Sequence, residues 1–210
     1  MSGDVVLLRA PADSIFARGF AQLARLPVDT VPWALVGGLG VAARLAGAFR
    51  ATSDIDAVSP DVDDLVEMLV RSGGVRTGGR VRLQGVPVDA IPVPGSGGGR
   101  LPNARSWAFD TATPVRVVVL GPDGETLADA NPAVATRAAL VLMKLESAVH
   151  GYDRSAAKQA TDIYDVLRLI APALAILGAE LASAPRALRA DAAQCARTRL
   201  IRDPPRRSGT

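Results

Sequence analysis

Residue types that commonly carry metal or redox chemistry are scarce in this sequence. It contains one cysteine, Cys195, and one histidine, His150. A disulfide within the chain is therefore excluded, and so is a cysteine-based zinc site, which needs several thiolate or imidazole ligands. Aromatic residues make up only 4% of the chain, so few side chains are present to stack on nucleotide bases. The cysteine usage suits a reducing compartment, and we expect a cytoplasmic protein.

Long apolar runs are also missing. No stretch approaches the ~20 apolar residues that cross a bilayer, and the longest candidate, residues 170–181, has the length of a core helix. The apolar run at residues 5–8 is too short for the apolar region of a signal peptide. We therefore expect no membrane partner. Apolar residues at 49% and charged residues at 21% are typical of a folded protein.

Lysine is rare, whereas arginine is abundant. The 24 basic residues comprise 22 arginines and 2 lysines, and the sequence pI is about 9.6. Arginine binds phosphate through paired hydrogen bonds, so the composition permits a nucleic-acid partner, although a GC-rich genome produces the same excess. The C-terminal arginines either follow an RNA backbone or form a solvated helix face. They are Arg186, Arg189, Arg197, Arg199, Arg202, Arg206 and Arg207.

The first half of the chain alternates helical and extended patterns. Apolar residues at a period near 3.6 predict helices, and short apolar or alternating runs predict strands. Prolines and glycines mark the breaks between them. The predicted order is a helix at 12–26, a strand at 33–36, a helix at 39–49, a strand at 53–58, a helix at 61–71, and strands at 81–83 and 86–93.

The second half becomes helical. The glycine-rich residues 95–99 predict a loop beside the core, and a strand at 115–120 ends at a turn over 121–124. Helices are predicted at 132–149, 155–170, 173–182 and 189–201. The sequence thus predicts an α/β fold with a mixed sheet, in which residues 1–125 form a catalytic core and residues 126–210 a C-terminal helical bundle.

Three aspartates stand out by their placement. Asp54 and Asp56 are two residues apart on a predicted strand, so both carboxylates project from one face. Asp89 is the only charged residue of the apolar strand at 86–91. Three carboxylates on neighbouring strands can hold two divalent cations, and all-oxygen ligands favour Mg²⁺. An Asp-x-Asp at a strand end is often only solvated, but an unpaired carboxylate in an apolar strand is costly.

A phosphate-binding feature precedes these aspartates. Gly37 and Gly38 begin a predicted helix, where glycine allows close approach of the backbone and the free N–H groups bind phosphate. Ser53 can donate a hydrogen bond to a phosphate oxygen. A Gly-Gly pair by itself is most often only a turn. The order of the glycines and the three aspartates therefore carries more weight than any one of them.

These motifs resemble those of a known superfamily. Residues 35–38, 50–56 and 88–91 look like the glycine signature, the paired aspartates and the third aspartate of polymerase-β-type nucleotidyltransferases. Within it, residues 50–56 resemble the AbiEii-like and MenT-like toxin nucleotidyltransferases. Residues 142–148 and 158–167 resemble the lysine helix and the Lys-Asp-x-x-Asp helix of those toxins. Gln159 departs from that pattern, because an acidic residue is usual there.

The resemblance implies a function and further site residues. It implies that Lys144 contacts a triphosphate and that Asp162 positions catalytic groups. Lys158 and Asp162 are also spaced as an ordinary helix-surface ion pair. The implied activity is metal-dependent transfer of a nucleoside monophosphate from an NTP, with a pyrimidine favoured, to the 3′ end of tRNA, with pyrophosphate released. A toxin of this kind would have a cognate antitoxin protein. The alternatives are a transferase that modifies an antibiotic and a catalytically silent member that only binds nucleotide.

Overall fold

The computed structural model describes residues 5–27, 30–45, 52–94, 103–150 and 155–198. Its central feature is a mixed seven-stranded sheet with the strand order β4-β5-β6-β3-β2-β10-β7. The strands are β4 (Gly74–Thr77), β5 (Arg80–Leu83), β6 (Val86–Pro92), β3 (Ile55–Ser59), β2 (Ala34–Val36), β10 (Ala133–Val134) and β7 (Thr113–Pro114). Strands β3 and β6 run parallel, and β2 is antiparallel to β3.

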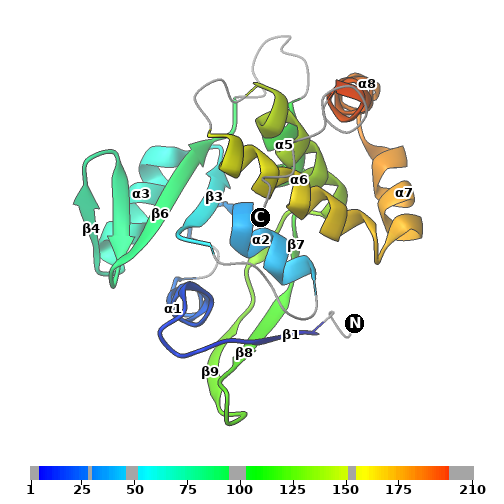
Figure 1. Cartoon of the computed structure of the whole chain (residues 1–210). Helices are drawn as coiled ribbons and strands as arrows, with labels where there is room; N and C mark the ends of the chain where they lie inside the picture. Colours follow the sequence, from blue (N-terminus) through cyan, green and yellow to red (C-terminus); the bar gives the residue numbers. More distant parts are fainter. Residues whose placement is uncertain (1–4, 28–29, 46–51, 95–102, 151–154, 199–210) are drawn as a thin grey trace.

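A second sheet has three strands in the order β1-β8-β9 (Figure 1). Strand β1 (Val5–Arg9) runs parallel to β8 (Arg116–Leu120), and β9 (Thr126–Ala130) is antiparallel to β8. Helix α1 (Ile15–Leu23) packs on this sheet and buries Phe20 completely. Full burial of a phenylalanine stabilises the fold by roughly 2–3 kcal/mol.

Helices of the N-terminal half flank the seven-stranded sheet. They are α2 (Gly37–Arg44), α3 (Val62–Arg71) and α4 (Ala104–Asp110). Helix α3 begins at Asp61, whose carboxylate accepts a hydrogen bond from the Asp64 amide, and it buries Leu65 and Leu69 against β4, β5 and β6. A side-chain cap of this kind satisfies one of the free N–H groups at a helix start.

The C-terminal helices are α5 (Arg137–His150), α6 (Ala156–Ile170), α7 (Leu174–Ser183) and α8 (Arg186–Ala196). Helix α5 contacts each of the other three, and it also packs on α2 and α4 (Figure 1). A second apolar core lies here, with Leu140, Val166 and Leu169 almost fully buried. The predicted α/β fold with a mixed sheet and C-terminal helices is confirmed.

Some predicted elements differ from those observed. Helix α5 begins at 137 rather than 132, because Val134 pairs with Leu35 and extends the sheet. Strands β1, β4, β7, β9 and β10 and helix α4 were not predicted, since each is short and owes its stability to pairing or packing with distant segments. Helix α8 begins at 186 instead of 189. The loop at 95–99 and the predicted ends of two helices, 46–49 and 199–201, lie outside the described residues.

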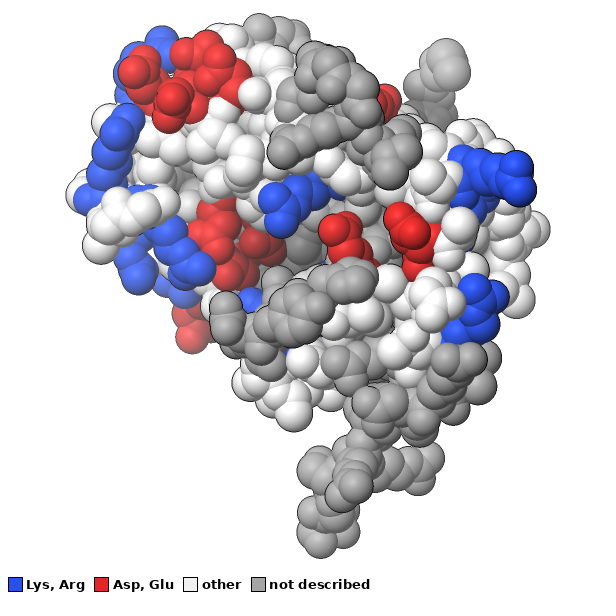
Figure 2. Space-filling view, turned by 90° about the horizontal axis from the view of Figure 1, so that it is seen from above, with Lys and Arg blue, Asp and Glu red and all other residues white. Residues whose placement is uncertain are grey.

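In the described part of the chain no single helix is long and apolar enough to cross a membrane. Helices α6 and α7 reach the required length and apolar composition only together, and they are bent by 103° relative to each other. The surface carries charges of both signs. Figure 2 shows acidic and basic side chains interspersed on the face at the top of Figure 1. Lys and Arg gather along the left edge of this view, the side on which β4 lies in Figure 1.

Candidate metal and nucleotide site

The junction of β2 and α2 requires glycine. Gly37 has a φ of +61°, and a Cβ at this position would overlap the carboxylate of Asp56. A Cβ on Gly38 would in turn overlap the Thr52 side chain. Only glycine allows the backbone to turn this tightly against the neighbouring strand. The junction therefore brings the N-terminus of α2, with its free N–H groups, beside Asp56.

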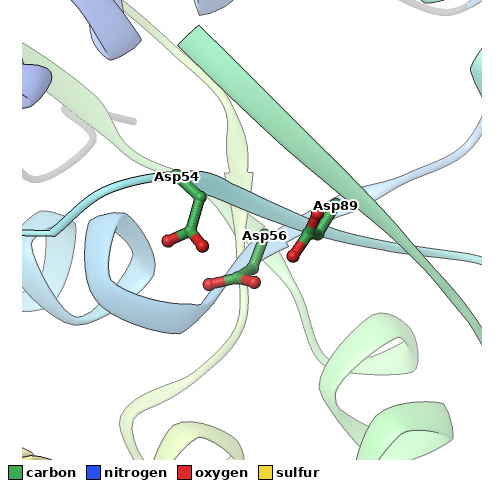
Figure 3. A group of neighbouring side chains, drawn as sticks. All are labelled: Asp54, Asp56 and Asp89. Atoms are coloured by element: carbon green, nitrogen blue, oxygen red, sulfur yellow. The ribbon is translucent and has the colours of Figure 1, made fainter. Parts of the chain in front are cut away.

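The three predicted aspartates lie together. Asp56 pairs in register with Val36 of β2 on one side and with Asp89 of β6 on the other. One carboxylate oxygen from each of Asp54, Asp56 and Asp89 lies within 4.8 Å of the others (Figure 3). Asp54 precedes β3 by one residue, so the prediction that both aspartates belong to the strand is wrong for Asp54. The predicted grouping of the three carboxylates is nevertheless observed.

Burial and mutual repulsion disfavour the charged form of Asp56. Its pKa rises from 3.8 to about 6, first because burial removes water from the carboxylate and then because Asp54 and Asp89 lie near. Lys144 and Lys158 act in the opposite direction. The pKa of Asp89 is also raised, mainly by burial. An added positive charge would relieve this repulsion.

Asp89 also contacts a basic side chain. The Nε atom of Arg80 lies 2.8 Å from Oδ1 of Asp89, and this ion pair lowers the pKa of Asp89 against the effect of burial. The contact is an ion pair without hydrogen-bond geometry: Oδ1 is buried and accepts no hydrogen bond from the described residues. This oxygen is therefore a suitable ligand atom for a cation.

These residues fit a divalent metal ion. The donor set consists of carboxylate oxygens, which Mg²⁺ prefers, and the site contains a buried oxygen without a hydrogen-bond donor. The glycine junction leaves space beside Asp56 that any larger residue would fill. Asp54, Asp56 and Asp89 would hold the ion.

A cavity of about 530 Å³ adjoins two of the aspartates. Its wall combines the β2–α2 junction and the segment before β3 with residues of α5 and the start of α6. The lining residues are Val36, Gly37, Gly38, Thr52, Ser53, Asp54, Asp56, Ile91, Leu140, Met143, Lys144, Ser155, Ala157, Lys158, Thr161 and Asp162. This volume is within the range of small-molecule sites.

Lys144 reaches the cavity from α5 and forms two ion pairs with α6. Its Nζ atom lies 2.8 Å from Oδ1 of Asp162 and 3.0 Å from Oδ2 of Asp165. The lysine side chain is 13% exposed, and the two carboxylates are 1% and 0% exposed. The two acids hold the ammonium group at the cavity wall, and its positive charge lowers the pKa of Asp56.

The residues predicted from the sequence therefore converge. Gly37, Gly38, Ser53, Lys144 and Asp162 line the cavity together with Asp54 and Asp56, and Asp89 joins the metal-ligand group from β6. Their catalytic and binding roles remain predictions.

Sequence reasoning missed Thr52, Arg80 and Asp165. Thr52 stands next to the predicted Ser53, so its position was a usable signal. Arg80 and Asp165 had none, because each is identified only by its contact with a residue distant in sequence.

Comparisons with known proteins give no family assignment. No family model matches the chain, and no curated protein matches it. An antigenic nucleotidyltransferase-like protein from Paracoccidioides brasiliensis is 19% identical with a TM-score of 0.47, and the match covers 89% of this chain and 94% of that one.

Two structures of ANT(2″)-Ia are also similar. The one in complex with adenylyl-2″-tobramycin is 17% identical with a TM-score of 0.48, covering 83% of this chain and 94% of that one. The solution structure of the antibiotic-resistance factor is 16% identical with a TM-score of 0.48, and the match covers 83% of this chain and 88% of that one. Similarities at this level assign neither a family nor an activity, so the function follows from the site.

Proposed function

We propose that this protein is a metal-dependent nucleotidyltransferase that transfers a nucleoside monophosphate from an NTP to a hydroxyl acceptor. The observation that carries the proposal is the register of β2, β3 and β6, which sets Asp56 between the glycine junction and Asp89. Carboxylates that bind metal, a helix N-terminus that binds phosphate and a cavity for the nucleotide are then adjacent. Nucleotidyl transfer requires these three features together.

Each part of the site has a chemical task. Bound Mg²⁺ would lower the pKa of the acceptor hydroxyl and neutralise charge on the triphosphate. Asp54, Asp56 and Asp89 hold the metal. The backbone N–H groups at Gly37 and Gly38 and the hydroxyl of Ser53 donate hydrogen bonds to phosphate oxygens. Lys144 places a positive charge at the cavity wall, where charge develops during displacement of pyrophosphate.

We further propose that the acceptor is the 3′ end of tRNA and that the protein is a cytoplasmic toxin with a cognate antitoxin, using a pyrimidine nucleotide. The support is the resemblance of residues 50–56 and 158–167 to toxin nucleotidyltransferases, together with the excess of arginine. Arginine suits a polyanionic acceptor, whereas a cationic antibiotic would be repelled by it.

The test is incubation of the protein and Mg²⁺ with total tRNA and each labelled NTP in turn. We expect label on tRNA that is lost in EDTA, in the Asp56→Asn variant and when the tRNA 3′ end is blocked. Label found only on small molecules would overturn the tRNA proposal and favour the antibiotic-modifying alternative. Nucleotide binding without turnover on any acceptor would favour the alternative of a catalytically silent protein that only binds nucleotide. Expression should arrest growth for the wild type and not for Asp56→Asn.

A further inference from the structure

A row of side chains crosses the sheet outward from the metal site. Val81 pairs with Val88 in the antiparallel β5–β6 ladder, so Arg80 stands opposite Asp89. The 2.8 Å contact between these two side chains agrees with this register. Thr77 of β4 pairs in turn with Arg80. Paired residues of a ladder project from one face, so Thr77, Arg80, Asp89 and Asp56 share a face of the sheet.

This face is open over β4 and β5. Helix α3 packs on the opposite face, where Val81 and Leu83 are buried with Leu65 and Leu69. In Figure 1, α3 lies behind β4 and β6, and among the described residues no helix covers the front. The side chain of Arg80 is 60% exposed and Val75 is 65% exposed. We define the hairpin face as Val75, Thr77, Arg80 and Arg82, the outward residues of β4 and β5.

The charges of the two faces differ. Arg80 and Arg82 supply the charge of the hairpin face. On the other side, the exposed acids Asp63, Asp64 and Glu67 of α3 outnumber the two exposed arginines there, Arg71 of α3 and Arg76 of β4. The hairpin face is therefore the more positive of the two, and a polyanion is attracted to it in preference to the α3 side. Figure 2 shows basic side chains along its left edge, the side on which β4 lies in Figure 1.

The spacing of these groups suits an extended nucleic-acid strand. Arg80 and Arg82 are two residues apart on one strand, so their Cα atoms are about 7 Å apart, close to the separation of successive phosphates in an extended chain. The guanidinium group of Arg80 has several N–H donors, and its contact with Asp89 uses Nε. Its terminal nitrogens remain suited to a phosphate. Thr77 adds a hydroxyl donor, and the exposed Val75 offers an apolar contact for a base.

We propose that the hairpin face binds the single-stranded 3′ end of an RNA acceptor and delivers its terminal hydroxyl to Asp89 and Asp56. The proposal rests on the proposed nucleotidyl transfer and assigns the acceptor to a surface outside the nucleotide cavity. Arg82 and Thr77 lie outside that cavity, and Arg80 joins the surface to the metal site. The arginines of α8 would then be a solvated helix face.

The decisive variant is Arg82→Glu, with Arg189→Glu as the matched control. Both arginines are exposed and the charge change is identical, but Arg189 lies on α8. We expect Arg82→Glu to raise the KM for an RNA acceptor at least tenfold, with kcat and the KM for NTP unchanged. The dependence of log KM on log salt concentration should weaken by about 0.7 for each phosphate that the variant no longer binds. Arg189→Glu should change neither the KM for the RNA acceptor nor its dependence on salt.

A second measurement separates this proposal from the proposed function. Fluorescence anisotropy in EDTA follows binding of a short fluorescein-labelled RNA that ends in a 3′-deoxy nucleotide, which needs no turnover. Weaker binding by Arg82→Glu and not by Arg189→Glu supports the hairpin face even if no transfer is observed. Equal binding by wild type and Arg82→Glu, or a loss confined to Arg189→Glu, overturns it while leaving nucleotidyl transfer intact.

Discussion

Two groups of carboxylates lie at or next to the same cavity in different electrostatic surroundings. Asp56 lies on β3, Asp54 lies just before this strand, and Asp89 lies on β6. Their mutual repulsion adds to the effect of burial in raising the pKa of Asp56 to about 6. Asp162 and Asp165 are more deeply buried but share the ammonium group of Lys144 at 2.8 and 3.0 Å. In the first group Asp89 also forms an ion pair with Arg80, whereas the pKa of Asp56 is raised by burial and by its acidic neighbours. In the second group both carboxylates contact one internal cation.

Burial alone therefore does not identify a ligand group. The fully buried acids of α6 share one ammonium group and position Lys144. The half-buried acids of the sheet include Asp56, whose charged form is disfavoured by burial and by its acidic neighbours, and this is the condition that favours metal binding. Variants that remove charge should accordingly have opposite effects on stability in the two groups.

The largest expected effect is loss of nucleotidyl transfer when an acid of the metal-ligand group is replaced. Asp54→Asn and Asp56→Asn should each lower the rate of pyrophosphate release by roughly 10³-fold, equivalent to about 4 kcal/mol of transition-state stabilisation. The thermal stability of both variants should be at least that of the wild type. Asp129→Asn, an exposed carboxylate on β9, is the control and should keep full activity. Near-normal turnover by either site variant would refute the metal assignment.

The acids of α6 that contact Lys144 should reveal their role through stability. Lys144→Ala leaves two buried carboxylates without their shared cation, and removal of one partner from a buried ion pair costs about 3–5 kcal/mol. Chemical denaturation measures this loss. Adding Asp162→Asn and Asp165→Asn to the variant should restore part of the stability, because the two buried negative charges are removed. An unchanged midpoint for Lys144→Ala would show that the ion pairs contribute nothing.

The pH dependence of stability should distinguish the two groups further. The folded-state pKa of Asp56 is raised, so the unfolded chain binds fewer protons between pH 3.8 and about 6, and this residue lowers stability as pH rises through that window. In metal-free buffer, the free energy of unfolding of Asp56→Asn should exceed that of the wild type by up to about 3 kcal/mol above pH 7. Below pH 4 the two free energies of unfolding should be equal. Saturating Mg²⁺ should reverse the order by stabilising only the wild type.

The smallest expected effect tests the glycine junction. Gly37 and Gly78 both have a φ of +61°, but only Gly37 has a neighbour that a Cβ would meet. Alanine should cost both sites about 1–2 kcal/mol of backbone strain. Only Gly37→Ala should also displace Asp56 and weaken Mg²⁺ binding, which isothermal titration calorimetry can measure. Equal Mg²⁺ affinity in the two variants would show that the junction has no role at the metal site.

The sequence by itself determined the local features of the site. The spacing of Asp54 and Asp56, the position of Asp89 in an apolar strand and the Gly37–Gly38 pair are read directly from the chain, because period-two alternation and glycine conformation are local properties. Helices α3, α6 and α7 were predicted to within one residue at each end, since their apolar residues follow a helical period.

Only the tertiary structure decided which of these features meet. The register that places Asp56 opposite Asp89, the contact of Arg80 with Asp89 and the pairing of Lys144 with Asp165 join segments that no local pattern connects. Sequence alone also treated Ala133 and Val134 as the start of a helix, whereas pairing with β2 makes them a strand. The physical reason is that strand register and buried ion pairs depend on distant partners, and these interactions override local propensity.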